Sequence, residues 1–329
     1  MIKVAICITT YNLEKYIAQA LDSVLSQKTN FDYKIIIADD CSSDNTINIL
    51  SDYQTCYPEI IELMTTPVNL GSLANSNRIF DGLQSQYFTF LDGDDYWIKD
   101  TMLQEQVDFL DSHPKYSICG ANTYYLKNDK LDGYVIPKDK TGKTYSFDDY
   151  LNYKMPFVHT SSILVRNTIF INGLPKCYKE VVGTFEDCAL RGEDFRRIIH
   201  LEQGAAYIMD DFFSVYRIHD KGIWQGSSVG KRLIEGAIGE NFYKKFFGNK
   251  YGNVFVQRSQ KTYQSLIRTL LIDFSLLADY HLTNKESFLL TAYLNDISKN
   301  NHIYTVKTKS LNKRRMILLL MKIIQYLCK

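Results

Sequence analysis

Apolar strand-like runs alternate with helix-like segments through the N-terminal part of the chain. The strand-like runs are 2–9, 33–38, 60–65 and 87–91, and the helix-like segments are 14–27, the stretch around Leu50, and 72–84. Strands and helices that alternate in this way build a mainly parallel sheet with helices on its faces. The 329 residues, 45% of them hydrophobic, suffice for one large domain and a smaller one. The sequence therefore predicts an α/β fold.

Polar and acidic residues stand where three of these strands end. They are Thr9 to Asn12 at the end of the first strand, Asp39 and Asp40 after the second, and Asp92 to Asp95 after the fourth. Ligands of an open parallel sheet bind beyond the carboxyl ends of its strands. We therefore expect the two acidic clusters, far apart in the sequence, to face one cleft.

Three carboxylates lie close together at Asp92, Asp94 and Asp95. Neighbouring carboxylates repel one another and raise one another's pKa unless a cation or several donors neutralise them. A hard divalent cation with oxygen ligands, Mn²⁺ or Mg²⁺, meets that need. The alternative is a solvated acidic turn in which Gly93 supplies a positive φ. The second acidic cluster favours the metal site.

Common nucleotide and calcium motifs are missing from the sequence. The turn after the first strand has no GxGxxG, and no GxxxxGK[ST] occurs anywhere. The acidic run does not fit an EF-hand, since Trp97 and Leu103 stand where Gly and Glu are needed. A bound diphosphate would therefore be neutralised by a metal and by basic side chains.

The second half of the chain is less regular. We expect a helix over 102–112, loops or edge strands over 124–147, a strand with a polar centre over 157–165, and a strand within 205–218. From residue 232 onward the pattern is helical. The predicted domains are 1–230, which carries the sheet, and 231–329, a helical region that ends in a basic amphipathic tail, 307–329.

Two acid pairs are candidates for a general base. Glu193 and Asp194 stand at a helix start, where the helix dipole favours negative charge, and Glu186 and Asp187 precede them by seven residues. Spacing alone does not rank the pairs.

Two basic side chains alternate along the end of the last predicted strand. Arg217 and His219 point the same way there and could neutralise phosphate or add a metal ligand. A glycine-rich loop with Lys221 and Trp224 follows, of the kind that closes over sites.

Charge and cysteine content bear on location. Residues 297–329 contain eight Lys or Arg and no Asp or Glu, so a basic tail follows an acidic body. The apolar run 316–327 is either a core helix or an interfacial helix on anionic lipid. Seven cysteines without a CxxC pair, and a strand directly after Met1, predict reduced thiols in the cytoplasm. We expect a peripheral protein on the inner face of the cytoplasmic membrane, because no run reaches the roughly 18 apolar residues of a span.

Taken in order, these motifs resemble those of the family-2 inverting glycosyltransferases of GT-A fold, of the bacterial type that builds capsules and other surface polysaccharides. The matching stretches are Ile8 to Asn12, Ala38 to Asp44, Asn69 to Gly71, Phe90 to Trp97, Gly192 to Asp194 and Tyr216 to His219. The resemblance covers residues 1–230. It implies a Rossmann-like mixed, mainly parallel sheet and metal-dependent transfer of a hexosyl or N-acetylhexosaminyl group from a nucleotide diphosphate, UDP, to a hydroxyl of a glycan or lipid-linked acceptor.

The resemblance also implies a role for each matching residue. The residues that border the donor are Thr9, Thr10, Tyr11, Asn12, Asn69 and Gly71, and Asp40 accepts a hydrogen bond from the uracil imide. The donor is also held by Asp92, Gly93 and Asp95, while Asp94 and His219 bind the metal. The general base is Asp194, with Glu193 beside it. Arg217 or Lys221 assists the leaving diphosphate. The family's spacing selects Glu193–Asp194 over Glu186–Asp187. Many members have an Arg-Asn pair after Asn-x-Gly; here Arg78 is the candidate for that arginine.

Two other classes of function stay open at this stage. The acidic motif also occurs in haloacid-dehalogenase-like phosphatases, on their first strand, whereas here three strands precede it. A catalytically silent assembly subunit is the other alternative. We expect no nucleic-acid partner, and the sequence leaves an oligomer open.

Overall fold

The computed structural model describes residues 1–190, 194–219 and 229–272. Their contacts divide the chain into two units. The first unit holds the residues up to Lys179 and those from Asp194 to His219, and the second holds Glu180–Leu190 and the described residues from Val229 onward. The predicted boundary near residue 230 and the tail 307–329 stay predictions, because residues 220–228 and 273–329 lie outside the described part.

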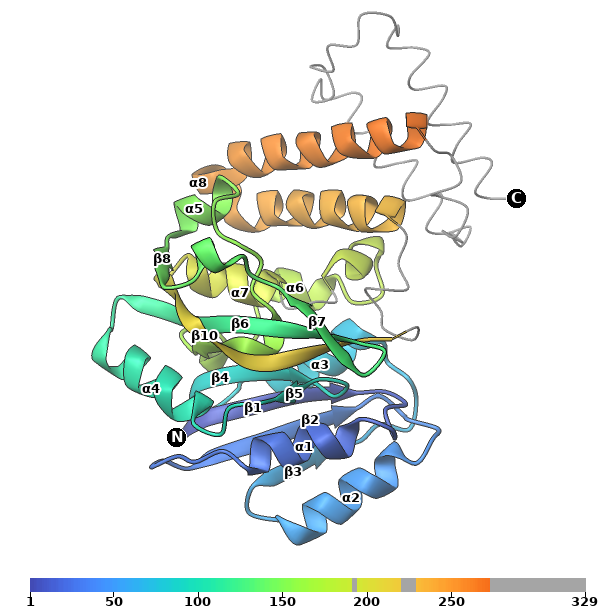
Figure 1. The fold of residues 1–329 in the computed structure, drawn as a ribbon. Coiled ribbons are helices and arrows are strands. Elements are labelled where there is room, and N and C mark those ends of the chain that lie inside the picture. Colours follow the sequence, from blue (N-terminus) through green and yellow to red (C-terminus); the bar gives the residue numbers. More distant parts are fainter. Residues whose placement is uncertain (191–193, 220–228, 273–329) are drawn as a thin grey trace, which may run out of the picture. The chain divides into compact units, whose positions relative to one another are not determined.

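A ten-stranded mixed sheet forms the first unit (Figure 1). Its parallel half consists of β1 (Ile2–Thr10), β2 (Tyr33–Asp39), β3 (Ile61–Met64) and β4 (Ser85–Asp92), in the order β3-β2-β1-β4. These strands match the four apolar runs of the sequence. From β1 the chain adds β2 and β3 on one side and then returns to place β4 on the other side of β1. The carboxyl end of β1 therefore lies between those of β2 and β4.

Helices cover both faces of this half-sheet. The connecting helices are α1 (Ile17–Leu25), α2 (Thr46–Cys56), α3 (Ser72–Phe80) and, after β4, α4 (Met102–Ser112). Leu21, Leu50 and Val107 pack from α1, α2 and α4 into one buried cluster with alternate strand residues such as Tyr87. On the opposite face Phe80 of α3 packs against Phe88. The alternation of side chains along β4 thus supplies both cores.

The other half of the sheet is mixed. It is built from β9 (Ile163–Arg166), β6 (Tyr116–Lys127), β10 (Ala205–Ile218) and β5 (Tyr96–Trp97), with β7 (Lys130–Tyr134) paired to β6 and β8 (Lys143–Tyr145) to β10. Strand β9 is antiparallel to both β4 and β6, while β10 runs parallel to β6. Short helices occupy the connections: η1 (Lys138–Lys140), α5 (Phe147–Leu151), η2 (Thr160–Ser162), η3 (Phe170–Asn172), α6 (Lys176–Glu180) and α7 (Asp194–Leu201).

The predicted strand over 157–165 is wrong in its first six residues. Strand β9 begins only at Ile163, and the 3₁₀ turn η2 precedes it. Local bonds explain the difference: Nδ1 of His159 accepts from the Ser161 amide at 3.3 Å, and the Ser162 amide donates to the His159 carbonyl at 3.1 Å. Such side-chain bonds compete with a sheet ladder.

The second unit is helical where it is described. The 3₁₀ turn η4 (Phe185–Ala189) packs on α8 (Val229–Ile272). Gly248, with φ 54°, interrupts α8 and folds it into two arms (Figure 1). Arg258 of the second arm pairs with Glu240 of the first at 2.8 Å, and both side chains are largely buried. Among the described residues, no helix is long and apolar enough to cross a membrane.

Candidate active site

Strand register brings the acidic clusters to one edge of the sheet. In the ladders Thr10 pairs with Asp39 of β2, and Thr9 pairs with Asp92 of β4. The ends of β1, β2 and β4 are therefore level with one another. This confirms the expectation that both acidic clusters lie at the same edge.

The loop after β1 is held by the loop after β2. Asn12, with φ 55°, donates its amide to Ser42 Oγ at 2.9 Å and accepts the Ser43 amide on its Oδ1 at 2.8 Å. Thr10 Oγ1 donates to the buried Asp39 at 2.8 Å. Tyr11, between them, is 50% exposed. The loop thus presents Tyr11 at the sheet edge while its neighbours are fixed.

Asp40 forms hydrogen bonds with a third loop, the one before α3, and so holds that loop at this edge of the sheet. Its carboxylate accepts the amides of Leu70 at 2.6 Å and Gly71 at 2.9 Å, and its carbonyl accepts from Asn69 Nδ2 at 3.0 Å. Gly71 has φ 86°, a conformation that favours glycine. A carboxylate has about four acceptor positions, so two bonds leave capacity for a ligand donor. Contact with a uracil imide stays a prediction.

Arg78 reaches back to the strand ends. Its guanidinium donates to the Thr65 carbonyl at 2.7 Å and to Asn75 Oδ1 at 2.9 Å, and more weakly to the Asp39 carbonyl at 3.4 Å. In this arrangement Arg78 braces the loops around the edge. Its contact with the donor stays a prediction.

The turn Asp92–Asp95 closes tightly over β1. The Asp95 amide donates to the Asp92 carbonyl at 2.9 Å. A Cβ on Gly93 would lie 2.8 Å from Leu13 Cδ1, 3.2 Å from Ile17 Cδ1 and 3.3 Å from Thr10 Cγ2. Gly93 does not have a positive φ, so that part of the alternative reading is wrong. A side chain at position 93 would therefore force the ends of these three neighbouring side chains to shift.

Asp95 is buried and joins three segments. Its carboxylate accepts the Arg217 amide and the Ser161 hydroxyl, each at 2.9 Å. Burial, and then the charges of Asp94 and Asp92, raise the pKa of Asp95 well above its usual range. The negative charges of Asp94 and Asp92 thus add to the cost of ionising the buried Asp95, and a nearby cation would lower that cost.

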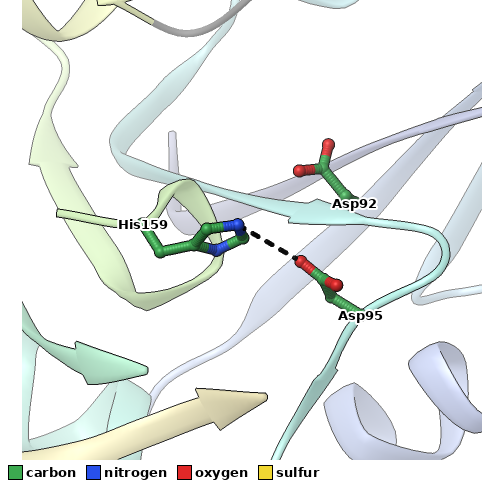
Figure 2. A group of neighbouring side chains, drawn as sticks. All are labelled: Asp92, Asp95 and His159. Carbon is green, nitrogen blue, oxygen red and sulfur yellow. Dashed lines mark ion pairs between the residues drawn. The ribbon is translucent and has the colours of Figure 1, made fainter. Parts of the chain in front are cut away.

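His159 is a site residue that the sequence reasoning missed. Ligand atoms of Asp92, Asp95 and His159 lie within 4.8 Å of one another, and His159 Nε2 is 3.7 Å from Asp95 Oδ2 (Figure 2). Burial, assisted by the Arg197 charge, lowers the pKa of His159 to about 3, so the ring is neutral. It stacks on Tyr216 with centroids 4.5 Å apart. The signal for His159 in the sequence is the polar centre of 157–165, a stretch whose pattern also predicts a strand.

Asp94 and His219, the predicted metal residues, are brought together. Asp94 Oδ2 lies 2.9 Å from His219 Nε2, and both side chains are partly exposed. Arg217 Nε donates to the Asp94 carbonyl at 3.0 Å, and its guanidinium lies over the Tyr16 ring at 4.8 Å. The predicted donor residue Lys221 lies outside the described residues.

Asp194 begins α7 and is held by an arginine. Its Oδ1 lies 2.5 Å from Nη2 of Arg197. The other terminal nitrogen of Arg197, Nη1, donates to the Val158 carbonyl at 2.9 Å. The Asp194 side chain is 57% exposed. Glu193 lies outside the described residues. Of the rival pair, Glu186 binds Lys245, and Asp187 accepts the Gly183 amide at 2.9 Å, both within the second unit.

Comparison with known proteins shows the family to which the chain belongs. The sequence matches the model of glycosyl transferase family 2 over residues 5–174, just over half of the 329 residues. The chain belongs to this family. The fold is accordingly of the GT-A type, with a smaller helical region after the sheet, as the sequence predicted.

Similar proteins are found within this family. An uncharacterized protein of Mycobacterium bovis is 27% identical over 223 residues, or 68% of this chain and 61% of that protein. The chain therefore spans about three fifths of that relative's length. The putative teichuronic acid biosynthesis glycosyltransferase TuaG of Bacillus subtilis is 30% identical over 149 residues, or 45% of this chain and 56% of its own.

Two solved structures share the fold. Staphylococcus aureus TarS 1–349 in complex with UDP-GlcNAc aligns with a TM-score of 0.51 at 15% identity, over 97% of this chain and 92% of the other. The mannosyltransferase PcManGT of Pyrobaculum calidifontis, in complex with GDP-Man and Mn²⁺, aligns with a TM-score of 0.52 at 14% identity, over 98% and 87%.

Proposed function

We propose that this chain is a metal-dependent, inverting glycosyltransferase. It transfers a sugar from a UDP-sugar to a hydroxyl of a glycan or lipid-linked acceptor in the synthesis of a bacterial surface polysaccharide. The proposal rests on the strand pairing, in which Thr9 of β1 pairs with Asp92 of β4 and Thr10 pairs with Asp39 of β2. This pairing places the acids at the ends of β2 and β4 beside the end of β1. Family membership favours transfer over the phosphatase alternative.

The donor assignment has support from relatives. TarS has been solved with UDP and with UDP-GlcNAc, and TuaG is named for teichuronic acid biosynthesis. PcManGT, by contrast, binds GDP-Man. UDP is the proposed nucleotide here because Asp40 lies at the sheet edge with acceptor capacity for an imide N–H, and Tyr11 stands exposed beside it.

The acidic cluster fits a divalent cation. Carboxylate oxygens and an imidazole suit Mn²⁺ or Mg²⁺. Burial, and then repulsion by Asp94 and Asp92, raises the pKa of Asp95, and such an ion would offset the repulsion. His159 accepts a hydrogen bond on Nδ1, so its proton is on Nε2, facing Asp95. We therefore assign the metal to Asp94 and His219, whose side chains lie 2.9 Å apart, with Asp92 in the same turn; His159 lies 3.7 Å from Asp95. When bound, the ion supplies positive charge against the diphosphate.

Residues of the chain accept the proton of the acceptor and stabilise the leaving group. Asp194 accepts the proton of the acceptor hydroxyl as its oxygen attacks the anomeric carbon, and Arg197 holds the carboxylate in place. One direct displacement inverts the configuration at that carbon. Arg217 lies beside the Asp94 turn, where its charge helps to stabilise the departing diphosphate.

We further propose a membrane-proximal location in the cytoplasm. The eight basic residues of 297–329 would hold the enzyme near anionic lipid, and so near a lipid-linked acceptor. The domain boundary at 230 belongs to the same proposal, because it separates the transfer domain from the region that carries the tail.

One experiment tests the central proposal. UDP release is measured from UDP-glucose, UDP-galactose and UDP-N-acetylglucosamine with Mn²⁺, with Mg²⁺ and with EDTA. A simple phosphate ester is assayed in parallel. We expect UDP release from at least one donor only with metal, and no hydrolysis of the ester. Ester hydrolysis would favour a phosphatase, and inertness towards all donors, together with no UDP binding, would favour a silent subunit.

A further inference from the structure

We propose that the exposed surface of Phe157 stacks against a sugar ring of the acceptor and thereby selects acceptors that present such a ring. The inference rests on the proposed function, because it places the acceptor beside Asp194. It concerns a residue that neither the sequence motifs nor the donor site involve.

Phe157 is joined to the candidate base through one arginine. The Arg197 guanidinium lies over the Phe157 ring, 5.5 Å from its centroid, and the same group binds Asp194 at 2.5 Å. A general base must come within about 3 Å of the hydroxyl that it deprotonates. An acceptor positioned for Asp194 therefore lies next to this ring.

Phe157 also borders the acidic cluster. Its ring meets that of His159 edge to face, with centroids 6.4 Å apart, and His159 Nε2 lies 3.7 Å from Asp95. The ring thus contacts both the arginine that holds the candidate base and the histidine beside the turn that would hold the donor diphosphate. We place the meeting of the acceptor and the donor sugar beside this ring.

The ring is exposed on a fixed segment of backbone. Phe157 is 53% exposed, whereas the next five residues, Val158 to Ser162, are buried. Trp97 Nε1 donates to the Ser161 carbonyl at 2.7 Å, and Arg197 Nη1 binds the Val158 carbonyl at 2.9 Å. Single exposed apolar side chains are common on surfaces. A rigidly mounted aromatic ring beside a catalytic carboxylate is less so, and such rings line sites for small ligands.

The chemistry of a sugar suits this position. A pyranose has a face of C–H groups that packs on an aromatic ring, and hydroxyls on its rim. One face of Phe157 is covered by the guanidinium, so the sugar takes the other, with one hydroxyl directed at Asp194. The occupant is a hexose ring of the acceptor; an acceptor without a sugar ring would gain nothing from Phe157.

The test uses the full chain with Phe157→Ala and Phe157→Trp, and with Tyr57→Ala as the matched control. Tyr57 is 42% exposed and precedes β3, so it lies near the amino ends of the parallel strands, whereas the candidate site lies at their carboxyl ends. Saturation-transfer NMR with UDP and diamagnetic Mg²⁺ reports binding of the methyl glycosides of glucose, galactose and N-acetylglucosamine. UDP release to water, without any glycoside, reports the donor site.

We expect at least one glycoside to bind the wild-type chain, and Phe157→Ala to weaken that binding by about tenfold, the size of a ring-stacking contact. Phe157→Trp and Tyr57→Ala should retain it, and UDP release to water should change less than about twofold in all three. The inference is overturned if Phe157→Ala binds glycosides normally, if its UDP release falls in step with binding, or if no glycoside binds the wild type. Failure of the proposed function is separate: no UDP release from any donor.

Discussion

The carboxylate of Asp94 lies 2.9 Å from the Nε2 atom of His219, although 125 residues separate them in the sequence. The contact joins the turn after β4 to the end of β10. The Tyr16 ring packs against His219 with centroids 5.0 Å apart, and so limits its movement. Two side chains that can ligate a cation are therefore held next to each other by contacts within the chain.

We expect Asp94→Asn to abolish sugar transfer and leave the fold intact. The amide keeps the size of the side chain and removes its charge, so the cluster loses affinity for a hard cation. UDP binding, measured by calorimetry, should no longer depend on Mn²⁺ and should be as weak as we expect for the wild type in EDTA. Asp108→Asn, at an exposed acid of α4, is the control. Full activity of Asp94→Asn, or of the wild type in chelator, would refute the metal assignment.

Replacing Asp194 by Asn should lower turnover by about 10² to 10⁴-fold, the usual cost of losing a general base. Donor affinity should change little, because Asp194 serves the acceptor. Asp187→Asn is the matched control from the rival acid pair, and its role in the structure is to accept the Gly183 amide. Steady-state kinetics of both variants decide the matter: a dead Asp187→Asn with an active Asp194→Asn reverses our assignment.

Gly93→Ala should destabilise the fold by about 1 to 3 kcal/mol, the typical cost of overpacking. The added Cβ would lie 2.8 Å from Leu13 and within 3.3 Å of Ile17 and Thr10. Urea unfolding measures the change. The control is Gly236→Ala on α8, where the nearest atom is 3.7 Å away and an alanine should stabilise the helix by up to about 1 kcal/mol. Equal effects of the two substitutions would contradict the packing described for the turn.

The acidic turn and its neighbour His219 were predictable, and the second histidine beside the turn, His159, was not. Asp92 to Asp95 form a local pattern, and parallel strands bring their ends together by a general rule, so the edge of the sheet followed from spacing. His159 reaches Asp95 only because β9 inserts antiparallel between β4 and β6, an order that no local pattern reveals. The turn η2 was mistaken for a strand because its Thr and Ser residues suit strands as well as local side-chain bonds.

Stability should fall with acid because of His200. Burial lowers the pKa of His200 from 6.5 to about 4, between the rings of Phe88 and Phe170. Below about pH 6.5 the unfolded chain binds a proton that the folded chain excludes, so stability is lost as pH falls towards 4. His200 should account for about 2 kcal/mol of the loss between pH 7 and pH 5.

The variant His200→Leu isolates that contribution. It keeps an apolar side chain between the two phenylalanines and cannot titrate, so urea unfolding at pH 7 and pH 5 should differ less for the variant than for the wild type. The same pair of measurements on His113→Leu, at an exposed histidine, is the comparison. An identical pH dependence for wild type and His200→Leu would show that His200 is not buried as described.

Truncation to residues 1–306 should abolish association with anionic vesicles and preserve UDP binding. Each Lys or Arg near an anionic surface contributes on the order of 1 kcal/mol, and the deleted segment contains seven of the eight basic residues of 297–329. The full-length chain should be released progressively as salt rises. Vesicle sedimentation measures both. Equal binding of the two chains would reject the membrane proposal, and unfolding of the short chain would favour a core role for 316–327.

The bonds of Asp40 bear on how the enzyme would meet its nucleotide. Because Asp40 holds Leu70 and Gly71, and Asn12 holds Ser42 and Ser43, hydrogen bonds within the chain itself fix the rim around the sheet edge. A nucleotide would then lose its own freedom on docking but would not have to order the backbone, which is the usual penalty of induced fit. We expect amide hydrogens at Leu70 and Gly71 to exchange slowly already in the apo enzyme, and the heat-capacity change of UDP binding to be small.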